Sequence, residues 1–293
     1  MTAKIYVCLV IGIISISLAS IFVKFCDTVP AMIIATYRMS ISTILLCLYI
    51  PFNKTNIINS LNKKDISMCL LSGMFLSLHF LLWFLSIKLT NIASSVVLVT
   101  TSPIFLGIIS KFILKKQIPR NILIAIVLSF IGVILIAQSD SNMLTEINKK
   151  ALLGNLLALS GGFMASLYLF IGSIQRTRQC TFEYIFFAYS FSAIIFITLT
   201  FIFDYSFFGY EKNDYIYMFL LAVIPQLIGH TSFNYSLKHL RPESVAIAIL
   251  GEPVGASILA YFIFDEKLQA LQAIGIILIL YSITLSTKME PLR

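Results

Sequence analysis

The chain has 293 residues, of which 59% are hydrophobic and 12% charged, and its formal net charge is +8. Soluble domains carry about 25% charged residues, so this composition, with a mean hydropathy of +0.95, excludes an ordinary soluble globule. The apolar residues come in long runs and the basic residues lie between them. Lipid is therefore the expected solvent, and we expect no nucleic-acid partner.

Taken in chain order, the apolar runs predict an all-α membrane protein with ten transmembrane helices. The expected ranges are 5–24, 30–50, 66–87, 92–114, 121–138, 152–174, 182–203, 215–236, 242–264 and 269–286. The first run lacks a convincing cleavage site, so it is interpreted as a membrane helix and not as a signal peptide. Most Lys and Arg residues fall in loops on the side of the N-terminus, which predicts a multi-pass protein of the cell (inner or plasma) membrane with both termini cytoplasmic.

The second half of the chain repeats features of the first at a fixed offset of 150 residues. Pro103 aligns with Pro253, and Gly12 aligns with Gly162. Each half holds five predicted helices, and because five is odd the second half enters the membrane from the opposite face. This predicts two five-helix inverted-topology repeats, residues 1–140 (helices 1–5) and 151–287 (helices 6–10), a plan that recurs in secondary transporters with a midplane substrate site.

Glu252 lies near the middle of the predicted ninth helix, between Gly251 and Pro253. An ionisable residue at such a depth costs a few kcal/mol, which favours a cavity carboxyl that binds a cationic substrate group or carries a proton. A protonated or paired structural carboxyl is the alternative. Pro253 leaves the carbonyl near Ile249 unpaired, and Gly251 with Gly255 forms a GxxxG pattern that permits close helix packing.

Other polar residues in the apolar runs are further candidates for substrate binding or coupling. Arg38 is expected to anchor a carboxylate or phosphate, to pair with Glu252, or to extend to the interface. His79 and His230 are candidates for proton relay or for buried structural histidines. Possible cavity lining, with simple packing as the alternative, is assigned to Trp83, Tyr37, Tyr168, Gln226 and Asn234. The expected cavity lies among helices 1, 3, 4, 6, 8 and 9.

The sequence resembles the EamA-type transporters of the drug/metabolite transporter (DMT) superfamily over essentially its whole length. The residues that carry the resemblance are Pro30, Ala35-Thr36-Tyr37-Arg38, Ala93, Pro103, Gly229-His230, Asn234-Tyr235-Ser236-Leu237, Val245, Leu250-Gly251-Glu252-Pro253, Asp265-Glu266 and Gly275. Lys116 and Ala125 stand in the first half where the second has Glu266 and Gly275, so the first repeat is the more diverged one. The resemblance implies a ten-helix bundle with a central cavity that moves small metabolites, often outward.

These observations predict a secondary active transporter that exports a small polar metabolite, an amino acid or related compound, by alternating access. An importer of a nucleotide-like cofactor or an amine is the alternative, and a non-transporting membrane protein is a further one. The expected partners are a small-molecule substrate, the lipid bilayer and, for coupling, protons. The five cysteines form no CxxC pair, and no nucleophile–base pair or nucleotide-binding loop occurs, so we expect no enzyme, no cofactor and no metal site. The oligomeric state stays open.

Overall fold

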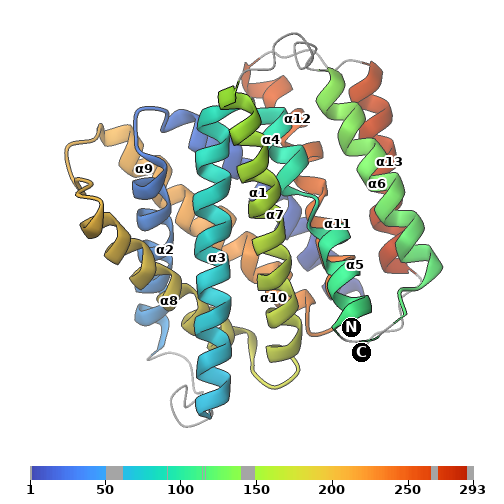
Figure 1. Cartoon of the computed structure of the whole chain (residues 1–293), viewed down its shortest axis with the longest axis horizontal. Coiled ribbons are helices and arrows are strands. Elements are labelled where there is room, and N and C mark those ends of the chain that lie inside the picture. Colours follow the sequence, from blue (N-terminus) through green and yellow to red (C-terminus); the bar gives the residue numbers. More distant parts are fainter. Residues whose placement is uncertain are drawn as a thin grey trace.

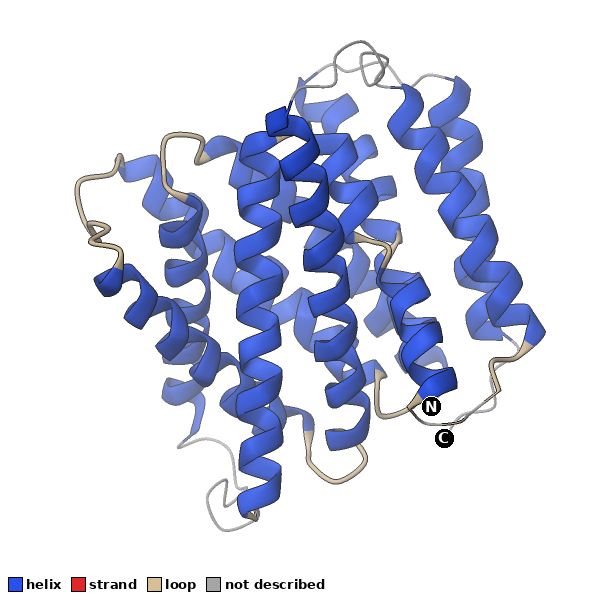
Figure 2. Cartoon of the chain, viewed as in Figure 1, coloured by secondary structure: helices blue, strands red, loops and turns tan. Residues whose placement is uncertain are grey.

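The computed structural model describes residues 2–50, 62–90, 92–113, 115, 117–139, 149–264 and 270–288. Within these residues every regular element is a helix and none is a strand (Figure 2). The first elements are α1 (Thr2–Phe25), α2 (Ala31–Tyr49), α3 (Lys63–Leu89), α4 (Ile92–Val99), α5 (Ser102–Phe112), α6 (Arg120–Ser139) and α7 (Lys149–Gln175). The later ones are α8 (Thr181–Ile202), α9 (Lys212–Leu221), the π-helix η2 (Ala222–His230), α10 (Thr231–Ser236), α11 (Pro242–Ile249), α12 (Gly251–Phe264) and α13 (Ala270–Lys288).

Six helical segments of the described chain are long and apolar enough to cross a membrane, and shorter apolar helices accompany them. The six are Ala3–Phe25, Ala31–Tyr49, Lys63–Leu89, Leu152–Gln175, Thr181–Ile202 and Lys212–Ser236. A helix satisfies all its backbone hydrogen bonds internally, which is why long apolar runs adopt this form in lipid. The all-helical, multi-pass part of the prediction is therefore confirmed, whereas the count of ten spans stays a prediction.

Two ranges that the sequence predicts as single helices are interrupted, and a third is continuous but contains a π-helical stretch. The range 92–114 contains α4 and α5, the range 242–264 contains α11 and α12, and the range 215–236 contains α9, η2 and α10. Each holds a proline, which removes one backbone donor and crowds the preceding turn. Pro103 begins α5, Pro225 lies inside η2, and Pro253 lies in the first turn of α12. The sequence predicts each of these ranges as a single helix because the apolar pattern continues across the proline.

The helices pack in pairs that bring distant parts of the chain together. Helix α3 packs along α7, α2 along α8, and α6 along α13, while α1 contacts η2 and α12. Figure 1 shows α6 and α13 side by side at one flank of the bundle, with α2, α8 and α9 at the other. The main core lies between these helices, and a smaller apolar cluster joins α6, α11, α12 and α13.

Large apolar side chains also cover much of the outside of the bundle. Val127 on α6 and Ile277 on α13 are 59% and 65% exposed, and similar residues recur along both helices. Polar groups gather inside instead, and Arg38, Arg176, Gln226 and Asn234 are all buried. This inside-out arrangement is that of a protein whose outer surface faces lipid.

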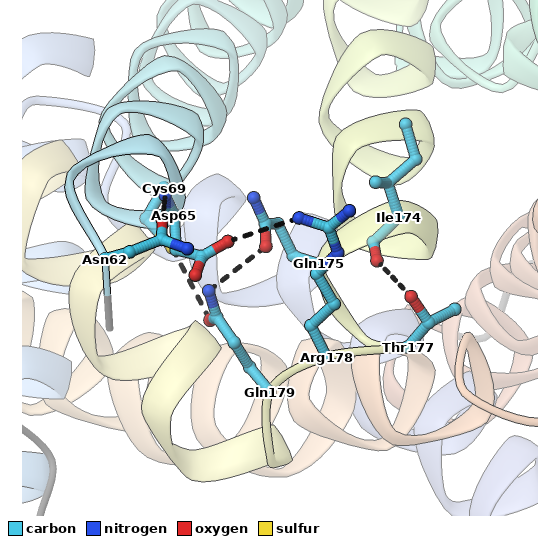
Figure 3. A network of polar contacts seen from close by, with 8 residues as sticks. All are labelled: Asn62, Asp65, Cys69, Ile174, Gln175, Thr177, Arg178 and Gln179. Atoms are coloured by element: carbon cyan, nitrogen blue, oxygen red, sulfur yellow. Dashed lines mark hydrogen bonds and ion pairs between the residues drawn. The ribbon is translucent and has the colours of Figure 1, made fainter. Parts of the chain in front are cut away.

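Polar side chains tie the start of α3 to the turn that follows α7 (Figure 3). Asn62 caps α3 by accepting a hydrogen bond from the Asp65 amide at 2.8 Å, and the Asp65 carboxylate lies 3.9 Å from Arg178. Gln179 donates to Gln175 at 3.1 Å and accepts from Cys69 at 3.6 Å. The ends of two long helices are thereby held together at one end of the molecule.

Candidate functional site

A cavity lies inside the bundle, and its polar lining is unusual for a membrane protein interior. Seven segments contribute to it, namely α1, α2, α3, the α4–α5 junction, α7, the end of η2 with α10, and the α11–α12 junction. The lining residues are Ile16, Ala19, Arg38, His79, Phe80, Trp83, Val99, Thr100, Ser102, Ala165, Tyr168, Leu169, His230, Phe233, Asn234, Ile249 and Glu252. The expected set of lining helices omitted the second helix, although Arg38 of that helix was a candidate site residue, and the structure adds α2 to the lining through Arg38.

The space in this cavity is small. The cavity volume is about 50 Å³. Since one water needs roughly 10–15 Å³ on this measure, the cavity has room for about three to five waters. A larger cargo therefore requires the surrounding helices to move apart.

Arg38 is a buried cation on one wall of the cavity, with 1% of its surface exposed. Its Nε donates to the side-chain oxygen of Gln226 at 2.9 Å, and its guanidinium lies 4.1 Å from the ring centre of Phe80. Its Nη1 has no hydrogen-bond partner in the structure. Among the described residues no acidic side chain lies within the 4.0 Å ion-pair distance of Arg38, so the expected pairing with Glu252 is absent in this conformation.

Glu252 lies in the first turn of α12, directly after the break that separates it from α11. It is 9% exposed, and its Oε1 is buried without a hydrogen-bond partner in the structure. The start of a helix carries partial positive charge, which favours a carboxylate there. The interruption thus places the acid at a helix terminus and beside a cavity.

Two glycines let α1 approach the turn that carries Glu252. A Cβ added to Gly251 would lie 2.6 Å from Ile13, and one added to Gly255 would lie 2.0 Å from the Ser17 hydroxyl. The Ser17 hydroxyl donates to the Ile13 carbonyl at 2.7 Å and lies 3.4 Å from the backbone carbonyl oxygen of Glu252. The α1 helix therefore supports the acid through its backbone.

The two broken helices meet the cavity at equivalent points. Helix α4 ends at Val99 and α11 ends at Ile249, positions that differ by the 150-residue offset found in the sequence. Thr100 and Ser102 line the cavity at the first break, as Ile249 and Glu252 do at the second. Pro103 follows the first break and Pro253, which is buried, follows the second.

Both predicted histidines reach the cavity, where they flank one phenylalanine ring. The His230 ring lies 5.4 Å from that of Phe80, edge to face, and the His79 ring lies 5.0 Å from it. His79 Nδ1 lies 3.0 Å from the carbonyl oxygen of Gly161. A carbonyl only accepts, so Nδ1 carries the proton and, in the neutral ring, Nε2 is left as an acceptor.

Trp83 and Asn234 each present an unpartnered polar atom. The Trp83 ring is parallel to that of His79 at 6.2 Å, and its Nε1 is buried with no hydrogen-bond acceptor in the structure. Asn234 donates to the Tyr168 hydroxyl at 2.6 Å and to the His230 carbonyl at 2.9 Å, while its Oδ1 has no partner in the structure. Four unpartnered atoms, from Arg38, Trp83, Asn234 and Glu252, thus belong to residues that line one cavity.

Tyr37 is the one predicted site residue that the structure places elsewhere. Its hydroxyl donates to the backbone carbonyl of Phe207 at 2.8 Å, and its ring lies edge-on to Tyr215 at 5.7 Å. Neighbouring positions on a helix point about 100° apart. Because Arg38 faces the cavity, its neighbour Tyr37 faces the loop between α8 and α9.

The profile of the EamA-like transporter family matches residues 3–138 and 152–288. The chain belongs to this family. An uncharacterized transporter of Archaeoglobus fulgidus is 22% identical over 255 residues, covering 87% of this chain and 86% of the relative. An uncharacterized transporter of Clostridium kluyveri is 24% identical over 197 residues, covering 67% and 63%. A crystal structure of a protein superposes with a TM-score of 0.81 at 12% identity, covering 99% of each chain, which shows a shared fold.

This EamA-family chain is therefore a membrane transporter. Its site also contains residues that the sequence analysis did not single out as central. Phe80 lies between Arg38 and His230, and Gln226 holds Arg38. The position of Phe80 next to His79 in an apolar run gave no signal, because a phenylalanine there has the same pattern as a packing residue.

Proposed function

We propose that this EamA-family transporter is a secondary active transporter that exports a small polar metabolite, an amino acid or related compound, by alternating access. The observation that supports this most directly is the buried cavity in which a guanidinium and a carboxyl face the same space without an ion pair. A guanidinium and a carboxyl that do not pair with each other are suited to bind a cargo that carries both a negative and a positive charge. The guanidinium would take the cargo's carboxylate and Glu252 its ammonium group.

The two halves, residues 1–140 and 151–287, are proposed to be inverted-topology repeats of five spans each. In this proposal α4 with α5, α9 with η2 and α10, and α11 with α12 each count as one span, which gives ten. The packing supports it, because the first helix of each half contacts the broken helix of the other. Helix α1 lies against α12, and α7 lies against α4 and α5. Sites between inverted repeats, at interrupted helices, are typical of secondary transporters.

The remaining parts of the proposal concern orientation, energy and direction. Both termini lie in the cytoplasm, since most Lys and Arg residues fall in loops of that side. Glu252 is the group that carries a coupling proton or recognises the cargo's ammonium, and His79 and His230 serve as relay groups near it. Export across the plasma membrane is the direction that the resemblance to the family implies.

The test is flux through the purified chain in proteoliposomes, with three solutes that share one side chain. Leucine carries both charges, isopentylamine only the positive one, and 4-methylpentanoate only the negative one. They are assayed together with a mixed pool of cellular metabolites. We expect a zwitterion to be moved faster than its singly charged counterparts. If no solute in the pool moves faster than through protein-free liposomes, the proposal is wrong.

Direction is tested in cells. Cells that overproduce the chain and are loaded with the transported solute are expected to lose it faster than cells that produce Glu252→Gln. Faster accumulation from the medium, without faster loss, would favour the importer instead.

A further inference from the structure

Arg38 is a buried cation without a described acid at ion-pair distance, although Glu252 lines the same cavity. It is 1% exposed, it contacts the amide of Gln226 and the ring face of Phe80, and among the described residues no acid lies within 4.0 Å of it. An uncompensated buried charge costs several kcal/mol. A negative charge brought in by a ligand would remove much of that cost.

Gln226 contacts Arg38 but supplies no counter-charge. Its side chain is fully buried, and its Oε1 accepts from Arg38 Nε at 2.9 Å. A glutamate at this position would make the same hydrogen bond and would also neutralise the guanidinium. The amide therefore orients Arg38 without satisfying its charge, and Nη1 is left without a partner.

A second free donor lies on the same wall of the cavity. Phe80 and Trp83 are three residues apart on α3, so their side chains are neighbours on one helix face. The guanidinium lies over the Phe80 ring, and Arg38 and Trp83 line the same cavity as that ring. Trp83 Nε1 is buried and has no acceptor in the structure. Two unpartnered donors next to a cavity form a site for an acceptor.

We propose that Arg38 Nη1 and Trp83 Nε1 form a subsite for a compact monovalent anion, the carboxylate of the cargo, and that Gln226 keeps this subsite open by remaining neutral. The cavity, with room for about three to five waters, admits a group of the size of a carboxylate or a halide. The identification of the anion as part of the cargo rests on the proposed transport function, whereas the subsite itself does not. Gln226 acts through Arg38 and is a specificity-determining residue.

The tryptophan fluorescence of the chain reports on this subsite directly, because Trp83 is its only tryptophan. The purified full-length chain in neutral detergent is titrated with sodium iodide, an anionic quencher, at constant ionic strength. We expect saturable quenching of Trp83 emission, and we expect sodium acetate to relieve it. Caesium, a cationic quencher, is expected to give only weak, non-saturable quenching.

Gln226→Glu is the decisive variant. It supplies an internal counter-charge, so we expect the apparent iodide affinity to fall at least tenfold. Gln175→Glu is the matched control, since Gln175 is also a buried glutamine, 2% exposed, but lies at the end of α7 and hydrogen-bonds Gln179 instead of Arg38. Its iodide affinity is expected to equal that of the unmodified chain.

Two results would overturn the proposal without relying on any variant's folding. One is iodide quenching of the unmodified chain that stays linear and no stronger than quenching by caesium. The other is saturable quenching that acetate does not relieve, which would contradict a carboxylate subsite. Equal iodide affinity in Gln226→Glu would contradict the role of Gln226. A chain that binds iodide as expected but moves no solute would refute the transport proposal alone.

Discussion

The role of Glu252 can be tested by comparing its substitution with that of Glu243, a carboxyl in a similar position. Glu243 and Glu252 both lie in the first turn of a short helix, and both are buried, at 3% and 9% exposure, but only Glu252 lines the cavity. A hydrogen bond to a charged group contributes about 1.5–3 kcal/mol, which corresponds to roughly tenfold or more in affinity. We therefore expect Glu252→Gln to lower transport in proteoliposomes at least tenfold and to flatten its pH dependence.

The control for this prediction is Glu243→Gln. It is expected to reach the membrane in similar amount and to retain most of the transport activity. Equal transport by both variants across the pH range would remove Glu252 from the mechanism.

At this scale the sequence predicts charged residues well and their neighbours poorly. Arg38 and Glu252 stand out because a charge inside an apolar run is costly wherever it points. Gln226 carries no charge, and its role exists only because η2 packs against α2 and brings it to Arg38. Tyr37 is polar and lies in an apolar run, which predicted a cavity residue. In the structure it lies on another face of α2 and contacts Phe207.

Among the elements, the contact between α1 and α12 depends on glycine. A Cβ at Gly255 would lie 2.0 Å from the Ser17 hydroxyl oxygen, so a methyl group there forces the helices apart. Overpacking of this kind typically costs 1–3 kcal/mol. We expect Gly255→Ala to lower the thermal unfolding midpoint in detergent, and the double variant with Ser17→Gly to recover part of the loss.

Gly161 offers the matched control on α7. An added Cβ there would meet its nearest neighbour at 3.4 Å, an ordinary contact. Gly161→Ala should therefore leave the unfolding midpoint within about 1 °C of that of the unmodified chain, given that 1 kcal/mol shifts a chain of 150–250 residues by about 2–4 °C. A destabilisation as large as that of Gly255→Ala would contradict the argument from close approach.

Arg176 and Arg178, in the turn after α7, differ in burial and in the number of hydrogen bonds that they make. Arg176 is 1% exposed, and it donates to the carbonyl of Asn234 at 3.0 Å, to the carbonyl of Gln179, and to the Thr181 hydroxyl at 2.6 Å. Burial lowers its pKa from the ordinary value, which reflects the cost of removing the charge from water. Arg178 is 56% exposed and faces Asp65 at 3.9 Å.

We expect Arg176→Gln to destabilise the fold by about 3 kcal/mol or more, because several charge-assisted hydrogen bonds are lost and buried carbonyls are left unpaired. Arg178→Gln should cost less than about 1 kcal/mol, since an exposed ion pair is screened by water. Thermal unfolding of both variants in the same detergent separates the two. Similar losses would mean that the exposed ion pair contributes as much as the buried guanidinium.

The element boundaries show which signals in the sequence are ambiguous. Long apolar runs located the helices, because length and hydropathy are averaged over about 20 residues. The interruptions at Pro103 and Pro253 were not predicted as helix ends, since a proline in a membrane helix is compatible with either a kink or a break. The π-helix around Pro225 depends on one extra residue per turn, which leaves no clear mark in the hydrophobic pattern.

For the whole molecule, the central question is how the bundle is oriented in the membrane. The start of α1 and the end of α13 lie at the same end of the bundle (Figure 1), which is compatible with an even number of spans. The basic loops then predict that this end faces the cytoplasm. The loop between α8 and α9 and the turn between α10 and α11 should lie on opposite sides.

Single cysteines in those two connections give a direct measurement. In a background where the five native cysteines are replaced by serine, Ser206→Cys and Lys238→Cys place one thiol in each connection, and both positions are exposed. A membrane-impermeant maleimide added to intact cells should label the first variant and not the second. After the cells are opened both should react, which controls for thiol reactivity. Labelling of Lys238→Cys alone in intact cells would invert the orientation, and with it the side from which the cavity must receive its cargo for export.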